Sequence, residues 1–201
     1  MTPLTKEGAP SGATTLLSTG AQGLVGFALA PLDDRVYAVW TTQDMSFVGT
    51  STFAPLDPQT GAVQTSVVFD QGLSYAGGPV AEPSKHRLDV AVAQSNGGSF
   101  QIFRGTGAGL HLLSAVDATV AGPQLAVDPC AGLVALNPLD GGMKLTLQRV
   151  EDDGSLGPAV TLPTNGSVSF SEVVPVQGGL AVVWGDESSS GPFHLAFIAV
   201  E

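Results

Sequence analysis

The sequence predicts an all-β domain built from four consecutive repeats, and three observations carry this prediction. The chain of 201 residues places 26 glycines and 14 prolines between short runs of valine, leucine, threonine and serine. This composition is typical of short strands joined by turns. No window shows sustained 3.6-residue periodicity, so we expect almost no helix. Finally, a proline and a glycine each return at a nearly constant spacing, which indicates repeated structural units.

The first repeated feature is a proline at the end of an apolar run. Four prolines align at spacings of 52, 46 and 46 residues, namely Pro31, Pro83, Pro129 and Pro175. Each is followed within a few residues by a second apolar run: RVYAVW, RLDVAV, GLVALN and GLAVVW. Proline fixes φ and lacks the N–H that a β-ladder needs. We therefore expect each repeat to contain a strand that ends at the proline, a short turn and a second strand.

The second repeated feature is a glycine between two further runs. Gly61, Gly109 and Gly157 align at spacings of 48 and 48 residues. Glycine tolerates the positive φ that hairpin turns require, so we expect a hairpin at each of these positions. Two features with one period indicate four antiparallel strands in each unit of about 47 residues.

The units follow one another along the chain. Three complete units cover residues 22–72, 73–118 and 119–165, and the fourth covers residues 166–201. The fourth unit ends after its third strand, PFHLAFIAV, and so lacks a fourth. The N-terminal run GATTLLSTGAQG matches the missing strand in length, so we expect residues 13–20, within a closing segment of residues 1–21, to complete the last unit. Such closure satisfies strand edges that would otherwise stay open.

Four-stranded units at this period resemble the blades of the β-propeller superfamily. The resemblance covers nearly the whole chain and implies a single four-bladed propeller closed by its N-terminal strand. It rests on the period and the strand pattern, because the WD dipeptide, the kelch double glycine and the sialidase-type S-x-D-x-G-x-T-W box are absent. Haemopexin-like domains also have four blades, but their aromatic-rich repeat is absent, so their binding roles do not carry over.

Composition and charge limit the classes of partner that the chain is expected to bind. Hydrophobic residues make up 43% and charged residues 12% of the chain, which excludes a disordered protein. The formal net charge is −11, and the seven lysines and arginines are spread along the chain without a basic patch. We therefore expect no nucleic-acid partner and no binding to anionic membranes. No apolar run reaches 18 residues, so we expect no membrane span.

The termini and the single cysteine bear on the compartment. The first residues, MTPLTKEGAP, lack the basic and apolar regions of a signal peptide, so we expect a cytoplasmic protein, or an exported one whose leader has been removed. Cys130 alone cannot form an intrachain disulfide. It occupies the turn position that Leu32, Ser84 and Val176 hold in the other repeats, so we interpret it as an ordinary turn residue.

Three carboxylates recur near the repeat prolines. Glu82 and Asp128 precede their proline by one residue and Glu172 precedes its proline by three. Positions two apart in a strand share a face, so we expect these groups to point the same way near one mouth of a narrow channel. Close carboxylates raise a pKa or recruit a cation, and a hard cation prefers oxygen ligands. We expect no cofactor otherwise, and the alternative is that the three side chains fan out into solvent.

Four further residues form a candidate ligand site. Trp40 and Trp184 occupy equivalent ends of the second strand in the first and last units, with Tyr37 and Asn137 nearby in the repeat frame. Tryptophans in such strands usually belong to the core. The functional alternative is an aromatic wall for a sugar or an apolar ligand.

No catalytic template fits the sequence. It lacks G-x-S-x-G, H-E-x-x-H, P-loop and C-x-x-C motifs. We therefore expect a non-catalytic binding or scaffold module that recognises a protein, peptide or glycan on one propeller face. Two alternatives stay open: an enzyme that uses the three carboxylates or a metal at the channel mouth, and a structural subunit of an oligomer such as a homodimer.

The closing strand generates a prediction. Deletion of residues 1–20 should lower the free energy of unfolding by several kcal/mol, because it removes a whole strand and exposes an apolar edge. Denaturant titration of the full and shortened chains measures this loss. Equal unfolding midpoints with equal slopes would contradict the predicted closure.

Overall fold

The computed structural model describes residues 23–46, 48–72, 75–82, 85–93, 98–118, 124–128, 132–139, 143–186 and 193–199. Within these ranges the chain forms fifteen strands and no α-helix, so the predicted all-β fold is confirmed. No helix long and apolar enough to cross a membrane occurs in this part of the chain. The predicted closing strand, residues 13–20, lies outside the described residues.

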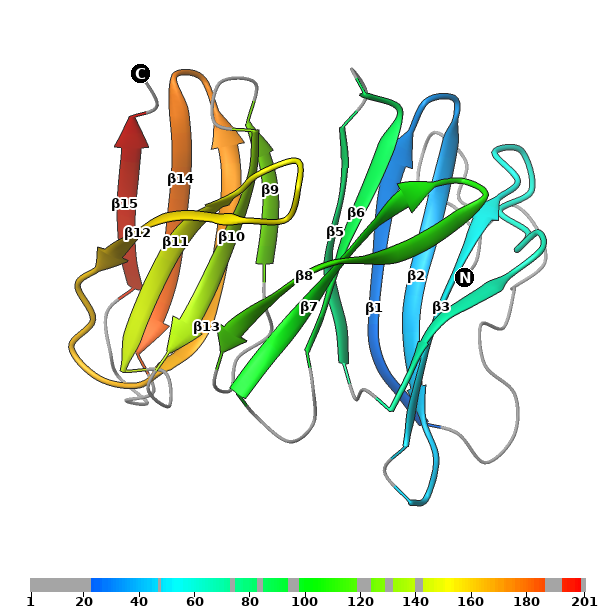
Figure 1. Ribbon diagram of the computed structural model, residues 1–201, viewed down its shortest axis with the longest axis horizontal. Helices are drawn as coiled ribbons and strands as arrows, with labels where there is room; N and C mark the ends of the chain where they lie inside the picture. Colours follow the sequence, from blue (N-terminus) through cyan, green and yellow to red (C-terminus); the bar gives the residue numbers. More distant parts are fainter. Residues whose placement is uncertain are drawn as a thin grey trace.

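The strands form four antiparallel sheets in which every strand pairs with its neighbour in sequence (Figure 1). Blade 1 contains β1 (Gly23–Leu32), β2 (Arg35–Gln43), β3 (Gly49–Leu56) and β4 (Val67–Gln71). Blade 2 contains β5 (Tyr75–Glu82), β6 (Arg87–Ala93), β7 (Gly98–Thr106) and β8 (Gly109–Ala118). Blade 3 contains β9 (Gln124–Asp128), β10 (Gly132–Leu139), β11 (Lys144–Val150) and β12 (Leu156–Leu162). Blade 4 contains β13 (Val168–Val176), β14 (Gly179–Asp186) and β15 (Phe193–Ala199).

The repeat prolines mark the ends of the first strands, with one refinement. Strands β5 and β9 end directly before their prolines. In blades 1 and 4 the strand continues one residue past the proline, because Pro31 and Pro175 still sit opposite Val36 and Leu180 in the ladder. The innermost strand of a propeller blade has one free edge, and a proline that faces this edge costs no ladder hydrogen bond.

The glycine landmark holds in blades 1 and 2 and moves in blade 3. Gly61 lies in the β3–β4 loop with a φ of +67°, and Gly109 opens β8 opposite Thr106. Gly157 lies inside β12, whereas the turn before it is made by Gly154 at a φ of +86°. Gly154 also leaves no room for a side chain, because an added Cβ would collide with the carbonyl oxygen of Leu113 in blade 2. The absence of a side chain at Gly154 therefore allows the turn of blade 3 to approach the backbone of blade 2.

The core consists of apolar layers between successive blades. Blades 1 and 2 share one layer, in which Val39 and Phe53 meet Leu88 and Val90. Blades 2 and 3 share a second, built around Phe100, Ile102, Leu133 and Ala135. Blades 3 and 4 share a third: Val134, Leu136, Leu145, Leu147, Val173, Leu180, Val182 and Trp184 belong to it. Alternate residues of a strand point to opposite faces, so each middle blade contributes to two layers.

The four blades are arranged as in a β-propeller, with three packed junctions. The inner strand β1 packs against β5, β5 against β9, and β9 against β13. Among the described strands no comparable packing joins β13 to β1. In Figure 1 blade 4 accordingly lies at one end of the long axis and blade 1 at the other, with blades 3 and 2 between them.

A charged network joins blades 2 and 3 at the turn before β12. The carboxylate of Asp152 accepts hydrogen bonds from Lys85 Nζ at 3.0 Å and Arg87 Nη1 at 2.9 Å. Arg104 donates from Nη1 to the Asp152 carbonyl oxygen at 3.1 Å. Both arginines also bond the fully buried Asp89, with Nε–Oδ distances of 3.1 and 2.7 Å. A buried carboxylate is tolerated when it is paired in this way, so the network satisfies Asp89 and ties two blades together.

This network generates a prediction about acid stability. The hydrogen bonds from Lys85 and then Arg87 lower the pKa of Asp152 to about 2 from its ordinary value of 3.8. Ionised Asp152 therefore favours the folded state above about pH 4, and this contribution is lost as pH falls through about 2. Because Asp152 is exposed, Asp152→Asn should cost no more than about 1 kcal/mol at neutral pH. Urea unfolding of both proteins between pH 2 and about pH 7 should show their difference shrinking toward acid.

Asp153→Asn is the matched control for this experiment. Asp153 is the adjacent exposed carboxylate, and it accepts a hydrogen bond from the Ser155 backbone N–H within its own turn, which an asparagine oxygen can also accept. An equal effect of the two substitutions would show that the hydrogen bonds from Lys85 and Arg87 to Asp152 add no stability.

Candidate functional site

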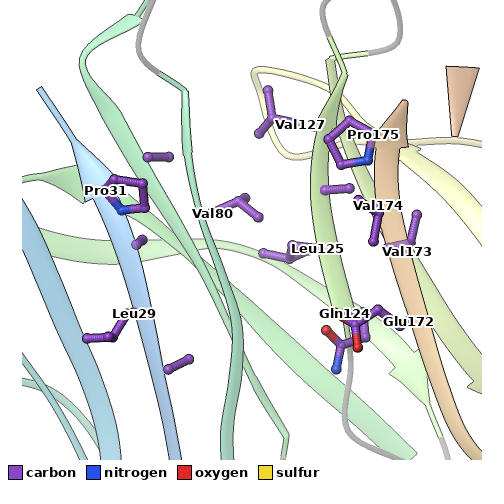
Figure 2. Close-up of a pocket in the computed structure, with 14 residues that line it drawn as sticks. Leu29, Pro31, Val80, Gln124, Leu125, Val127, Glu172, Val173, Val174 and Pro175 are labelled. Carbon is purple, nitrogen blue, oxygen red and sulfur yellow. The ribbon is translucent and has the colours of Figure 1, made fainter. Parts of the chain in front are cut away.

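A central pocket lies where the four innermost strands face one another. It has a volume of about 510 Å³ and is lined by residues of β1, β5, β9 and β13. Its wall is mainly aliphatic. Figure 2 shows Leu29 from β1, Val80 from β5, Leu125 from β9 and Val174 from β13 around the space. The first strand of every repeat thus contributes to one shared site.

Two polar side chains stand at one end of this pocket. Gln124 is the first residue of β9 and Glu172 lies in the middle of β13. In Figure 2 both lie at the end opposite Val127 and Pro175. Glu172 is exposed, whereas Val173 beside it is buried in the layer between blades 3 and 4. The pocket can therefore take an apolar group along its length and a hydrogen-bonding or positively charged group at this end.

The structure describes the side chains of two of the three candidate metal ligands, Asp128 and Glu172. Asp128 is the last residue of β9, is buried, and follows Gln124 by four residues. Glu82 is the last residue of β5, and its side chain lies outside the described residues. Among the described residues, no group of three His, Cys, Asp or Glu side chains is placed to hold a metal ion. A cation bound by all three carboxylates stays a prediction.

The aromatic candidates belong to different parts of the core. Trp40 packs with Ala38, Ala54 and Leu56 on the outward side of blade 1. Trp184 lies in the layer between blades 3 and 4. The structure therefore does not bring the two tryptophans together, and neither lines the pocket.

The remaining candidates are placed as follows. Tyr37 is buried between blades 1 and 2, where its ring centroid lies 6.4 Å from that of Phe53, and it does not line the pocket. Asn137 lies in β10, and its side chain is outside the described residues. Cys130, expected to be a turn residue, lies outside them as well.

Trp184 is held on both sides. Its ring stacks on His194 of β15, with 5.2 Å between centroids and 16° between planes. Ser171 sits directly opposite Trp184 in the β13–β14 ladder. The indole Nε1 and the Ser171 hydroxyl are both buried without a hydrogen-bond partner in the structure. Trp184 thus serves packing within blade 4 and against blade 3.

Sequence reasoning missed Gln124 and the aliphatic wall of the pocket. The signal was available, because every lining residue lies in the first strand of its repeat, at or before the repeat proline. The three candidate carboxylates, Glu82, Asp128 and Glu172, lie in three of these first strands. However, aliphatic residues in such strands are expected as core, so the sequence does not mark them as lining a cavity.

Comparisons with known proteins support the fold. No protein-family model matches the chain, and no curated protein sequence is significantly similar to it. Among solved structures, the Hadza microbial sialidase Hz136 matches 82% of this chain with a TM-score of 0.60 and 14% identity. A puromycin-hydrolysing peptidase from Mycobacterium tuberculosis matches 92% of it with a TM-score of 0.51 and 15% identity. The chain spans only 35% and 28% of those proteins, and similarity at these identities shows a shared β-propeller architecture alone.

The burial of Trp184 generates a prediction. Trp184→Ala should lower the free energy of unfolding by about 3–5 kcal/mol, because it empties a fully packed site between two blades. Urea unfolding followed by far-ultraviolet circular dichroism measures the change without relying on tryptophan fluorescence. A loss below about 1 kcal/mol would show that the indole is not part of the core.

Proposed function

We propose that the chain is a non-catalytic binding module whose central pocket takes a short segment of a protein or peptide. The proposal rests on the composition of the pocket wall, which is aliphatic on all four inner strands with Gln124 and Glu172 at one end. A volume of about 510 Å³ falls within the range of roughly 300–1,000 Å³ that is usual for ligand pockets. Such a wall suits one or two apolar side chains rather than an extended polar ligand.

The lining favours a peptide over a glycan. None of the 14 described residues that line the pocket is aromatic, and two of them, Gln124 and Glu172, have polar side chains. A sugar presents many hydroxyl groups, which lose their hydration on binding unless partners replace the water. An aliphatic wall with two polar groups cannot replace it. An apolar side chain gains free energy on entering the same wall.

Charge favours a basic group beside the apolar one. Glu172 is the one acidic residue among the described residues that line the pocket. The chain carries a formal net charge of −11, so its long-range field attracts cations. The proposed ligand therefore combines aliphatic side chains with a lysine, an arginine or a free amino terminus directed at Glu172.

The same lining gives little support to catalysis. Hydrolysis by carboxylates generally uses a pair of them on either side of the scissile bond, whereas the described residues that line the pocket include one. The sialidase and the peptidase share only the fold with this chain, so their activities provide no assignment of chemistry to it.

Peptide selection tests the proposal. A displayed library of random peptides, selected on the immobilised chain, should yield sequences in which a basic residue is flanked by aliphatic residues. Glu172→Gln should weaken binding of a selected peptide about tenfold and reduce its salt dependence, because it removes the opposite charge. Glu151→Gln makes the same chemical change outside the pocket and should leave affinity unchanged. Selection of acidic or purely polar peptides, or equal effects of the two substitutions, would overturn the proposal.

A further inference from the structure

The residues three positions before the repeat prolines form one set around the pocket. They are Ala28, Val80, Ala126 and Glu172, one from each of the four inner strands, and all four line the pocket. Three of them are aliphatic and the fourth is a carboxylate. The repeat places these residues at equivalent positions of their strands, so blade 4 alone supplies a negative charge to this set.

The lining of the pocket changes in polarity from one end to the other. Apolar residues, among them Val127 and Pro175, lie at one end, and the polar side chains of Gln124 and Glu172 lie at the other (Figure 2). A ligand group that matches this order is apolar for most of its length and positively charged at its tip. A lysine side chain has this order, because a flexible four-carbon stem separates its ammonium group from the backbone.

A free amino terminus matches the pocket less well. Its ammonium group is attached directly to Cα, so the first peptide group of the ligand would follow it into the apolar part of the pocket. Burial of a peptide group costs free energy unless each polar atom finds a hydrogen-bond partner. A lysine stem, in contrast, gains free energy when it packs along an aliphatic wall.

An arginine side chain also matches the pocket less well. Its planar guanidinium group has five N–H donors and stacks favourably on aromatic rings. None of the described lining residues is aromatic, and Gln124 and Glu172 are the two among them whose side chains carry oxygen acceptors. Their three side-chain oxygens can accept one hydrogen bond from each of the three N–H donors of an ammonium group.

We propose that the pocket recognises a lysine side chain of its ligand, with the stem against the aliphatic wall and the ammonium group at Glu172 and Gln124. The inference rests on the proposed function, because it specifies which basic group of a peptide enters the pocket. Glu172 is exposed, so the bound ammonium group keeps part of its hydration. Acetylation of a lysine removes its charge, so binding should depend on the acetylation state of the ligand.

Two displayed peptide libraries test this inference, one with lysine and the other with arginine as its only basic residue. Both are selected on the full chain, and the best arginine peptide should bind about tenfold more weakly than the best lysine peptide, or more weakly still. The lysine peptide is then synthesised with a blocked amino terminus in three forms, which carry lysine, acetyl-lysine or norleucine. Calorimetric titration should show that acetyl-lysine and norleucine each raise the Kd for the wild type about tenfold.

Glu172→Gln provides the double-mutant cycle for this measurement. In this variant the lysine, acetyl-lysine and norleucine forms should bind with similar Kd, because the charge that distinguishes them has lost its partner. Glu151→Gln is the matched control, since Glu151 lies outside the pocket, and it should preserve the preference for unmodified lysine.

The outcomes separate this inference from the proposed function. Equal affinity of the wild type for the lysine and acetyl-lysine forms, or tighter binding of arginine peptides, would overturn the assignment of lysine. Loss of binding on blocking the amino terminus would overturn it as well. In each of these cases an effect of Glu172→Gln on peptide affinity would still support the proposed function. The absence of binders from both libraries would overturn the proposed function and this inference together.

Discussion

The structure depends on one constraint: each sheet must bury its apolar faces against its neighbours. A strand directs alternate side chains to opposite faces, so a sheet inside the array needs two partners. Blades 2 and 3 meet this condition, because Val90 and Ala91 are adjacent residues of β6 that enter different layers. All three packed junctions follow from it, and so does the meeting of the four inner strands around one pocket. The central pocket is thus a consequence of the way the blades pack.

The charged network around Asp89 and Asp152 lies beside this apolar packing and adds hydrogen bonds between blades 2 and 3. The hydrogen bonds that Asp152 accepts from Lys85 and Arg87 have fixed lengths and partners. They lie beside the contact between Gly154 and Leu113, at the same junction of blades 2 and 3. The junction of blades 2 and 3 therefore combines an apolar layer with hydrogen bonds between the two sheets.

Much of the fold could be predicted from spacing alone. The prolines and glycines recur because each blade needs the same strand ends and the same turns. The number of repeats therefore predicts the number of blades, and the order of the runs within a repeat predicts the order of the strands. The site was harder to predict, because it depends on where strands from different repeats come to rest. Glu172 precedes its proline by three residues and Asp128 by one, and of the two only Glu172 lines the pocket. Whether Trp184 packs in the core or lines a pocket depends on which face of β14 meets blade 3, and the sequence of one repeat does not specify this.

The order of pairing has a consequence for how the molecule opens. Every strand pairs with its neighbour in sequence, and the packed junctions join each blade to the next. In an array connected in this way, the free energy of opening a unit is the sum of its own stability and that of the interfaces it loses. Among the described strands, blades 1 and 4 each lose one packed junction on opening, whereas blades 2 and 3 lose two. Amide hydrogen exchange in the isolated chain is therefore expected to be slowest in the middle of the array and faster toward both ends.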